Sequence, residues 1–408
     1  MRPILIVVWS VLAGQAALGA GKSDLAANAR AILGANQGVY VETRDGTALL
    51  AQAASIAVHP ASVSKIPTTL ALLRKLGPEH RFETTFRTSG KIVDGDLVGD
   101  LFVYAGGDPA FVDEDALLVA DRLREMGIRR VVGELHPRGT LTFDWQDDAD
   151  GAALRRALSG QIPAGALAAV RTFQLEQPAA PQPSSLTPQG IPFVVNPQTG
   201  QDNSAAAPER VLVIHRSQPL LPLAKSLNDY SNNIFKPLAD QAGGAEAVER
   251  LARSVVPPAM RSEITLGDGA GTDPRNRLSP RVTVQLLRAL DGELRKSGHA
   301  LFDILPVAGI DDGTLRHRFD GQEEIGRVVG KTGTFGDYGA SALAGAISTS
   351  DVGTVYFAIL NHNLPVPEAR RRQDRFVRVL LASLHSVPWD YQRDTRPAIA
   401  RAEVLKAP

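Results

Sequence analysis

The chain has 408 residues, 44% of them hydrophobic, with 44 Lys and Arg against 44 Asp and Glu and no cysteine. Zero net charge leaves no basic surplus for a phosphate backbone, which argues against nucleic acid as a partner. Disulfides, thiolate nucleophiles and Cys-based zinc sites are excluded, and the eight histidines show no metal-ligand spacing. The length predicts two or three domains with a sizeable core.

Residues 1–20 have the layout of a secretory signal peptide. Arg2 precedes a short apolar run over 4–13, and small residues follow over 14–20. The run is short for a bilayer span, and no other segment approaches about 18 uninterrupted apolar residues. We expect cleavage near Ala20, hence a periplasmic protein with no integral membrane segment in its mature chain. The alternative is an uncleaved membrane anchor.

The mature chain begins with elements that the residue pattern defines well. A helix is expected from Ser23 to about Leu33, and a strand over 38–43 leads to Asp45-Gly46, a hairpin signal. Two extended runs flank Asp94-Gly95 between 81 and 104. A helix is then expected over 113–126 and a strand over 128–135, and the Pro-, Gln- and Ser-rich stretch 177–190 is predicted to be a loop.

The last third of the chain shows the clearest strands. Residues 326–334, 340–347 and 354–360 are separated by short turns and predict an antiparallel meander. A helix is expected over 368–385, with an apolar face for covering the sheet formed by Phe376, Leu380 and Leu384.

The first chemical motif is Ser62-Val63-Ser64-Lys65, which opens a helix that stops before Gly77-Pro78. Residues three apart on a helix face the same way, so Ser62 and Lys65 can meet, and the helix N-terminus favours a developing oxyanion. Lys65 can accept a proton only when neutral, which desolvation and a second cation would promote. Alone the motif is weak, because an N-capping Ser followed by a solvated Lys has the same form. Pro67 requires the helix to begin near Val63 or Ser64.

The second motif is Ser231-Asn232-Asn233, in a polar stretch after a helical pattern. Ser231 could shuttle a proton between Lys65 and a leaving amine, and the Asn233 amide could hold a substrate peptide group. The register is ambiguous from the residues alone, since Ser226-Leu227-Asn228 has the same form. A polar turn without a function is the other alternative.

The third motif is Lys331-Thr332-Gly333-Thr334, at the end of an apolar strand. A Lys and hydroxyl groups on a strand edge can bind a substrate carboxylate, and Gly333 lets a substrate backbone come close to that edge. An exposed turn with a solvated Lys is less expected here, because Lys-Thr-Gly is rare by chance.

The three motifs occur in the order of the penicillin-recognising serine enzymes, each on the expected helix or strand. The chain resembles the class C low-molecular-mass penicillin-binding proteins, the D-alanyl-D-alanine carboxypeptidases and endopeptidases of DacB type. The likeness extends over most of the mature chain. It includes Gly106-Gly107-Asp108-Pro109, Asp268-Gly269-Ala270-Gly271, Asn276-Arg277-Leu278-Ser279-Pro280, Leu305-Pro306-Val307-Ala308-Gly309 and Asp312-Gly313-Thr314-Leu315.

The resemblance implies a role for each matching residue. Ser62 would be acylated and Lys65 would activate it, while Ser231 and Asn233 would line the opposite wall. Lys331, Thr332 and Thr334 would grip the terminal carboxylate beside Gly333, and the backbone N–H groups of Ser62 and Thr334 would form the oxyanion hole. Peptidoglycan peptides would be the substrates, β-lactam antibiotics would acylate Ser62 covalently, and no metal or organic cofactor would be required. Ala270 departs from the family, which usually has Ser there.

The fold implied is α/β (α+β): a serine β-lactamase/transpeptidase-like domain whose antiparallel sheet is covered by helices. We expect it to comprise residues 21–75 and 214–408, with helical structure beyond Val213, and to be interrupted by an inserted α+β domain over 76–213. Two alternatives remain. One is a β-lactamase or esterase on the same scaffold, although no added carboxylate motif supplies a deacylating base. The other is a catalytically silent periplasmic scaffold that binds wall polymer.

Overall fold

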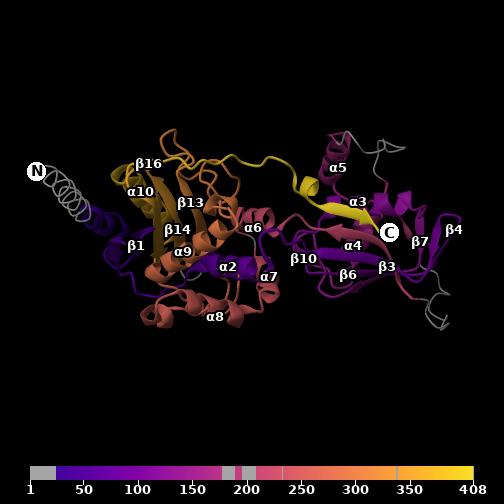
Figure 1. Ribbon diagram of the computed structural model, residues 1–408, viewed down its shortest axis with the longest axis horizontal. Coiled ribbons are helices and arrows are strands. Elements are labelled where there is room, and N and C mark those ends of the chain that lie inside the picture. The colour runs from indigo at the N-terminus through magenta and orange to yellow at the C-terminus, as the bar shows by residue number, and fades with distance from the viewer. Residues whose placement is uncertain (1–23, 177–188, 195–207, 232, 337–338, 408) are drawn as a thin grey trace, which may run out of the picture. The chain divides into compact units, whose positions relative to one another are not determined.

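A computed structural model describes residues 24–176, 189–194, 208–231, 233–336 and 339–407 of the chain (Figure 1). The expected signal peptide and most of the expected loop over 177–190 lie outside these residues. The described residues form two compact units. The first contains the chain up to Gly77 together with Ala224–Arg393, and the second contains Pro78–Leu223 together with Asp394–Pro408.

The first unit is built on an antiparallel sheet with strand order β13-β14-β15-β1-β2, and a short sixth strand pairs with β14. The expected meander and the β1–β2 hairpin are confirmed. The bounds are β1 Gly38–Thr43, β2 Ala48–Gln52, β13 Val328–Phe335, β14 Ala340–Thr349, β15 Gly353–Asn361 and β16 Ser386–Val387. Pairing of β1 with β15 joins the two ends of the unit's sequence in one sheet.

Both faces of this sheet are covered by helices. Val39 and Val41 of β1 point to the core shared with the helix over 24–33 and with α10 (Val366–Ser383). Glu42 points the other way and accepts hydrogen bonds from Gln285 on α9 (Pro280–Lys296). Figure 1 shows α10 and α9 on opposite sides of the strands. A strand between two helical layers has no solvent-facing side, which explains why all six residues of β1 are buried.

The helix that carries the first motif begins with a 3₁₀ turn, η1 (Ala61–Ser64), and continues as α2 (Lys65–Leu76). Pro67 is the third residue of α2, where its missing N–H costs no helical hydrogen bond, as the sequence required. The helix is buried from Lys65 to Leu73 and packs against α9, α7 (Phe235–Gln241) and α8 (Ala245–Val255). The chain then leaves the unit through Gly77.

The second unit holds a five-stranded sheet in the order β17-β12-β3-β6-β8, a four-stranded sheet β11-β7-β5-β4 and the hairpin β9-β10. Its strands are β3 Glu83–Thr88, β4 Lys91–Val93, β5 Asp96–Val98, β6 Leu101–Ala105, β7 Arg130–Val132, β8 Leu135–Arg138, β9 Thr142–Phe143, β10 Gln146–Asp147, β11 Phe193–Val194, β12 Arg210–Arg216 and β17 Glu403–Lys406. Its helices are α3 Asp113–Glu125, α4 Ala152–Leu158, α5 Ala164–Glu176 and the 3₁₀ turn η6 Ala398–Arg401.

Two sequence expectations are corrected in this unit. The strand expected over 128–135 is two strands, β7 and β8, which belong to different sheets. The break falls at Gly133, where an added Cβ would lie 2.4 Å from the carbonyl oxygen of Gly99. Helical structure begins not at Val213 but at Leu220, with α6 (Leu220–Asp229), because β12 continues to Arg216.

The expected domain boundaries also shift. The sequence predicts that residues 214–223 and the tail from Asp394 belong to the catalytic domain, whereas they group with the second unit. The reason is backbone pairing: β12 pairs with β3 on one side and with β17 on the other. The turns η3 (Pro258–Glu263) and η4 (Leu301–Asp303) complete the first unit.

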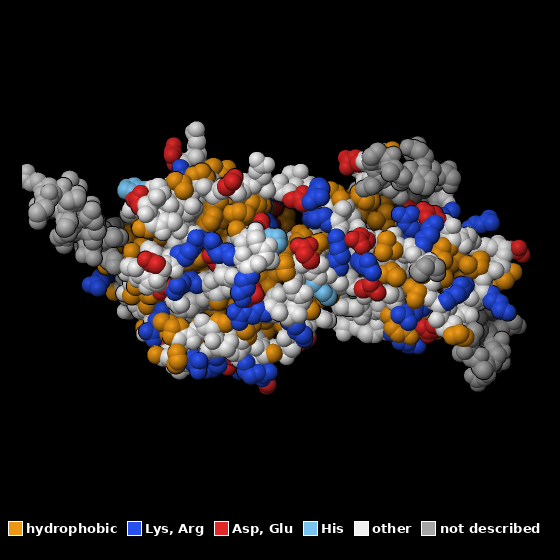
Figure 2. Space-filling model, viewed as in Figure 1, with side chains coloured by type: hydrophobic (Ala, Val, Ile, Leu, Met, Phe, Trp, Pro, Cys, Tyr) orange, Lys and Arg blue, Asp and Glu red, His pale blue; other side chains and the backbone are white. Residues whose placement is uncertain are grey.

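On the face that Figure 2 shows, Lys and Arg side chains are interspersed with Asp and Glu side chains across both units. In the described part of the chain, the search for a helix that is both long enough and apolar enough to span a bilayer finds none.

Candidate active site

Ser62 and Lys65 meet as the helical spacing predicted. Lys65 Nζ lies 2.7 Å from Ser62 Oγ, and it also donates to the carbonyl oxygen of Ala270 at 2.7 Å. Lys65 is fully buried, whereas Ser62 is partly accessible. Ser62 is therefore accessible to a ligand, whereas the amine of Lys65 that contacts its hydroxyl is shielded from water.

Burial changes the acidity of this lysine. It lowers the pKa of Lys65 to about 8, although the negative charge of Asp268 opposes the shift. The Phe235 ring at the start of α7 lies 5.7 Å from Nζ and adds to the apolar surroundings. Near neutral pH a useful fraction of Lys65 is neutral and can accept the proton of Ser62. No local pattern pointed to Phe235, which is brought to Lys65 only by packing of α7 on α2.

A second pair of an amine and a hydroxyl is formed by Lys331 and Ser231. Lys331 Nζ donates to Ser231 Oγ at 2.9 Å and to the Thr332 carbonyl at 3.0 Å. This contact favours the Ser231 register over the Ser226 register. Asn228 of the other register is buried and donates to the carbonyl of Ile304 instead.

The two lysines affect each other electrostatically. Burial holds the pKa of Lys331 well below its ordinary value, and the positive charge of Lys65 lowers it further, while Asp229 opposes both. Two ammonium groups in one desolvated region repel each other, so the arrangement favours a neutral amine. Burial also raises the pKa of Asp229 to about 7. Sequence reasoning missed Asp229, whose nearness to Lys331 comes from packing and not from any local pattern.

Thr332, Gly333 and Thr334, which follow Lys331 on the strand, each contact a different part of the first unit. A Cβ added to Gly333 would lie 2.6 Å from the Pro60 carbonyl oxygen and 3.1 Å from the Ser62 nitrogen. Glycine at 333 is therefore required by the turn that carries Ser62, in addition to any approach by substrate. Thr332 Oγ1 donates to Thr314 Oγ1 at 2.8 Å, and Thr334 Oγ1 accepts from Arg370 at 2.9 Å.

Asn233 is not joined to these groups. Its side chain is exposed and, among the described residues, has no polar partner, while its carbonyl accepts from the Lys236 N–H at 3.1 Å. The Asp312-Gly313-Thr314-Leu315 stretch supports the neighbouring Ser231 segment, because the Thr314 N–H donates to the Asp229 carbonyl at 2.9 Å.

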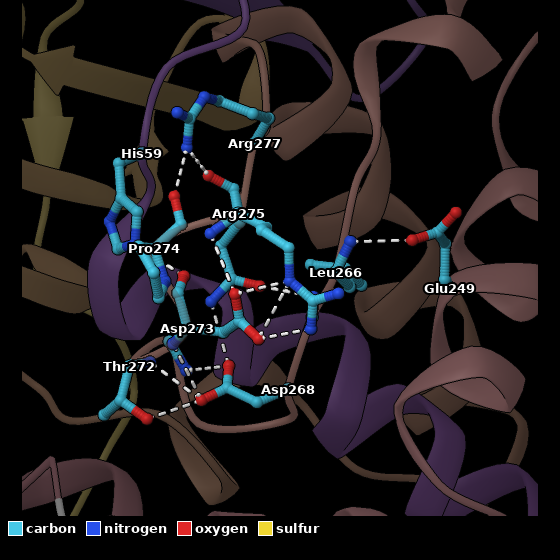
Figure 3. A network of polar contacts seen from close by, with 12 residues as sticks. His59, Glu249, Leu266, Asp268, Thr272, Asp273, Pro274, Arg275 and Arg277 are labelled. Carbon is cyan, nitrogen blue, oxygen red and sulfur yellow. Dashed lines mark hydrogen bonds and ion pairs between the residues drawn. The ribbon is translucent and has the colours of Figure 1, made fainter.

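The carbonyl that Lys65 contacts belongs to Ala270, in the loop over 266–277. Figure 3 shows the polar contacts around Asp268 and Asp273 of this loop. Asp268 accepts hydrogen bonds from the backbone N–H groups of Gly271, Thr272 and Asp273 and from the Asn276 side chain. Burial would raise the pKa of Asp268, but hydrogen bonds from the Thr272 hydroxyl, the Asn276 amide and the backbone N–H groups of Gly271 and Thr272 outweigh it and lower the pKa. Position 270 acts through its backbone oxygen, so replacement of the family's Ser by Ala leaves the contact with Lys65 intact.

The loop also packs closely on the nucleophile turn. Gly271 has a φ of +89°, and a Cβ there would lie 2.1 Å from the Ala61 carbonyl oxygen. Ala61 itself has a φ of +49°, in the left-handed region that non-glycine residues rarely adopt. Within the described ranges, no group of three His, Asp or Glu side chains is arranged to hold a metal ion.

Comparison with known proteins places the chain in a family. The model of the D-Ala-D-Ala carboxypeptidase 3 (S13) family matches residues 22–151 and 146–383. The carboxypeptidase DacB of Mycolicibacterium smegmatis is 25% identical over 391 residues, which cover 87% of this chain and 82% of that protein. A D-alanyl-D-alanine carboxypeptidase of Actinomadura sp. is 25% identical over 443 residues, covering 83% and 80%.

Solved structures agree on the fold. A penicillin G-acylated predatory endopeptidase of Bdellovibrio bacteriovorus aligns with a TM-score of 0.75 at 21% identity, covering 91% of this chain and 99% of that one. Penicillin binding protein 4 of Haemophilus influenzae aligns with a TM-score of 0.62 at 19% identity, covering 90% and 99%. The expected fold class is confirmed, as is the resemblance to the DacB-type enzymes. The chain belongs to the D-Ala-D-Ala carboxypeptidase 3 (S13) family.

Proposed function

We propose that the protein is an exported serine-type D-Ala-D-Ala carboxypeptidase or endopeptidase that acts on peptidoglycan stem peptides through an acyl-enzyme. The observation that carries the proposal is the 2.7 Å contact between the buried Lys65 amine and the accessible Ser62 hydroxyl. Family membership supports the substrate class, and the layout of residues 1–20 supports export.

The first step forms the acyl-enzyme. Neutral Lys65 takes the proton of Ser62, and Oγ attacks the carbonyl carbon of the penultimate D-Ala. The backbone N–H groups of Ser62 and Thr334 would stabilise the oxyanion. When the tetrahedral intermediate collapses, the C–N bond breaks and the amine leaves with a proton delivered through Ser231, which lies beside Lys331. Water then attacks the ester, and the stem peptide leaves with a new carboxylate.

The substrate's terminal carboxylate would lie at the end of β13, where Lys331, Thr332 and Thr334 supply an amine and two hydroxyls. Asn233 would hold a peptide group from the facing wall, and its exposed side chain leaves the amide available for substrate. β-Lactams would acylate Ser62 in the same way, because their ring amide mimics the D-Ala-D-Ala bond.

A labelled penicillin with peptide mass mapping tests the nucleophile. Label is expected on Ser62 and absent from Ser62→Ala. Ser254→Ala is the matched control, because Ser254 is an exposed serine of the same unit whose Oγ also donates to a backbone carbonyl, that of Leu251 at 2.7 Å. Label on any other residue would refute the assignment.

Purified muropeptides test the substrate. Release of D-Ala from monomeric muropeptides indicates carboxypeptidase activity, and separation of cross-linked dimers indicates endopeptidase activity. Ser231→Ala should slow both reactions, and Ser226→Ala is its control. Rapid sustained turnover of a chromogenic cephalosporin with no action on muropeptides would favour the β-lactamase alternative.

A further inference from the structure

His59, three residues before Ser62, contacts three parts of the active site at once. The Ala61 N–H donates to its Nδ1 at 3.1 Å, and its Nε2 lies 3.0 Å from the carbonyl oxygen of Asp273. Its ring stacks on Phe335, with 4.4 Å between centroids and 14° between planes. Figure 3 shows the imidazole beside the loop that contains Asp273. One buried side chain therefore links the nucleophile turn, the loop over 266–277 and the end of β13.

The two hydrogen bonds fix the protonation state of this ring. A backbone N–H can only donate, so Nδ1 must accept, and a carbonyl can only accept, so Nε2 must carry the proton. Only the neutral ring protonated at Nε2 satisfies both partners. A second proton on Nδ1 would face the Ala61 N–H and abolish that hydrogen bond.

The Ala61 peptide needs such an anchor. Its left-handed backbone is unfavourable for a residue with a Cβ and persists only where the surroundings enforce it. His59 holds the N–H side of Ala61, and Ser64 Oγ donates to its carbonyl. Ser62 follows directly, so the orientation of its Oγ depends on this strained peptide. The stacking partner Phe335 directly follows Thr334, whose N–H is the other proposed oxyanion donor.

We propose that His59 is a positioning residue for acylation: through Ala61 and Phe335 it holds the Ser62 turn in register with β13. This inference rests on the proposed function. His59 acts through its contacts with the Ala61 N–H, the Asp273 carbonyl and the Phe335 ring, so its effect on Ser62 is transmitted through the backbone. Because only the neutral ring makes both hydrogen bonds, protonation of His59 is expected to break its hydrogen bond with the Ala61 N–H.

The charges around the ring set the pH at which this occurs. Burial lowers the pKa of His59 below its ordinary value, and the nearby Arg277 lowers it further. The hydrogen bond to the Asp273 carbonyl opposes burial, as do the carboxylates of Asp268 and Asp273. On the side of β13 the neighbour is the uncharged Phe335. The net effect is a pKa below the ordinary value of a histidine, so neutral His59 prevails near pH 7 and is lost only as pH falls through that lowered pKa.

Three variants separate the contacts. His59→Phe keeps a ring for Phe335 but removes both hydrogen bonds. His59→Asn places an amide oxygen near the position of Nδ1, so it can accept from Ala61, but it does not titrate. His362→Phe is the control, because that histidine belongs to the same unit and its Nε2 also contacts a backbone carbonyl, that of Asn36 at 3.2 Å.

The measurement is the rate constant for acylation of Ser62 by penicillin, from pH 5 to 9, with thermal unfolding recorded for each protein. His59→Phe should acylate roughly 10- to 100-fold more slowly, the effect expected of a small misplacement of a reacting group. His59→Asn should remain within about threefold of wild type, as one retained acceptor predicts. Below the lowered pKa of His59 the logarithm of the wild-type rate should fall with a slope near two, from Lys65 and His59 together, but near one in His59→Asn.

The inference would be overturned if His59→Phe acylated at the wild-type rate and with the wild-type pH slope. It would also be overturned if His59→Asn and His59→Phe showed the same decrease in acylation rate. If His59→Phe shows no cooperative unfolding, His59→Asn and its pH slope decide the question alone. Failure of wild type itself to acylate at Ser62 would instead refute the proposed function, and the inference with it.

Discussion

Arg370 on α10 donates a hydrogen bond to Thr334 Oγ1 at 2.9 Å. The contact places a guanidinium beside a hydroxyl proposed to hold the substrate carboxylate, and guanidinium groups pair with carboxylates. Arg370→Ala is expected to reduce kcat/KM for a peptide ending in D-Ala by about two- to fivefold, because a solvent-exposed pair contributes little.

Two comparisons isolate that effect. The same peptide with a C-terminal amide should react equally with both enzymes, and high salt should narrow the difference for the acid. Arg371→Ala is the matched control, because Arg371 pairs with Glu368 on the same helix. An equal loss for the acid and the amide would show that Arg370 does not recognise the carboxylate.

The protonation of Lys65 predicts the alkaline part of the pH profile. Burial lowers its pKa to about 8, and the base must be neutral, so acylation of Ser62 should increase as pH rises through about 8 and then level off. Lys65→Arg cannot lose its proton and should acylate about 10²- to 10⁴-fold more slowly. The rate of β-lactam acylation between pH 6 and 10 tests this. A profile that is flat across pH 8 would exclude Lys65 as the base.

Glycine at 271 is expected to be indispensable for the nucleophile turn. Gly271→Ala would force a Cβ to within 2.1 Å of the Ala61 carbonyl at a positive φ, so we expect destabilisation of at least about 1–3 kcal/mol and a loss of acylation. Gly292 lies inside α9 with nothing within 4 Å of an added Cβ. Gly292→Ala should therefore stabilise by about 0.5–1 kcal/mol and leave acylation unchanged. Urea unfolding and penicillin labelling of both variants provide the test, and equal effects would contradict it.

The second unit contains a histidine buried between two carboxylates. His215 Nε2 lies 3.2 Å from Asp115 Oδ1, and Nδ1 lies 3.7 Å from Asp108 Oδ2. Burial alone would lower the pKa of His215, but Asp115 and then Asp108 outweigh it and raise the pKa. Burial raises the pKa of Asp108 to about 6. Both groups hold protons more tightly when folded.

The stability of this unit should therefore fall as pH rises. The contribution of His215 is complete below its unfolded pKa of about 6.5 and is lost as pH rises through its higher folded pKa. The protection factors of peptides from β12 and α3, in which the intrinsic pH dependence of exchange is divided out, should fall over that range in wild type. In His215→Gln the fall in protection above pH 6.5 should disappear, whereas His136→Gln, which removes a half-exposed histidine of the same unit, should retain it. An unchanged profile in His215→Gln would disprove the assignment.

Local rules were sufficient for part of this site. Ser62 and Lys65 are three residues apart on one helical turn, so their contact follows from helix geometry alone. The meander from β13 to β15 follows from alternating residues and short turns, which also placed Lys331 at the end of a strand. The placement of Pro67 in the first turn of α2 was likewise readable from the residues.

Other features were decided by tertiary structure. Ala270 and Lys65 are far apart in the chain, and nothing local indicates that a carbonyl would meet the amine. The same holds for Arg370 at Thr334, for His59 on Phe335 and for the pairing of β12 with β3 that moved a domain boundary. Periodicity and turn chemistry act over a few residues, whereas desolvation of a lysine depends on every segment packed around it. The sequence by itself therefore determined which groups could react, and only the fold determined which of them are buried, paired and shifted in pKa.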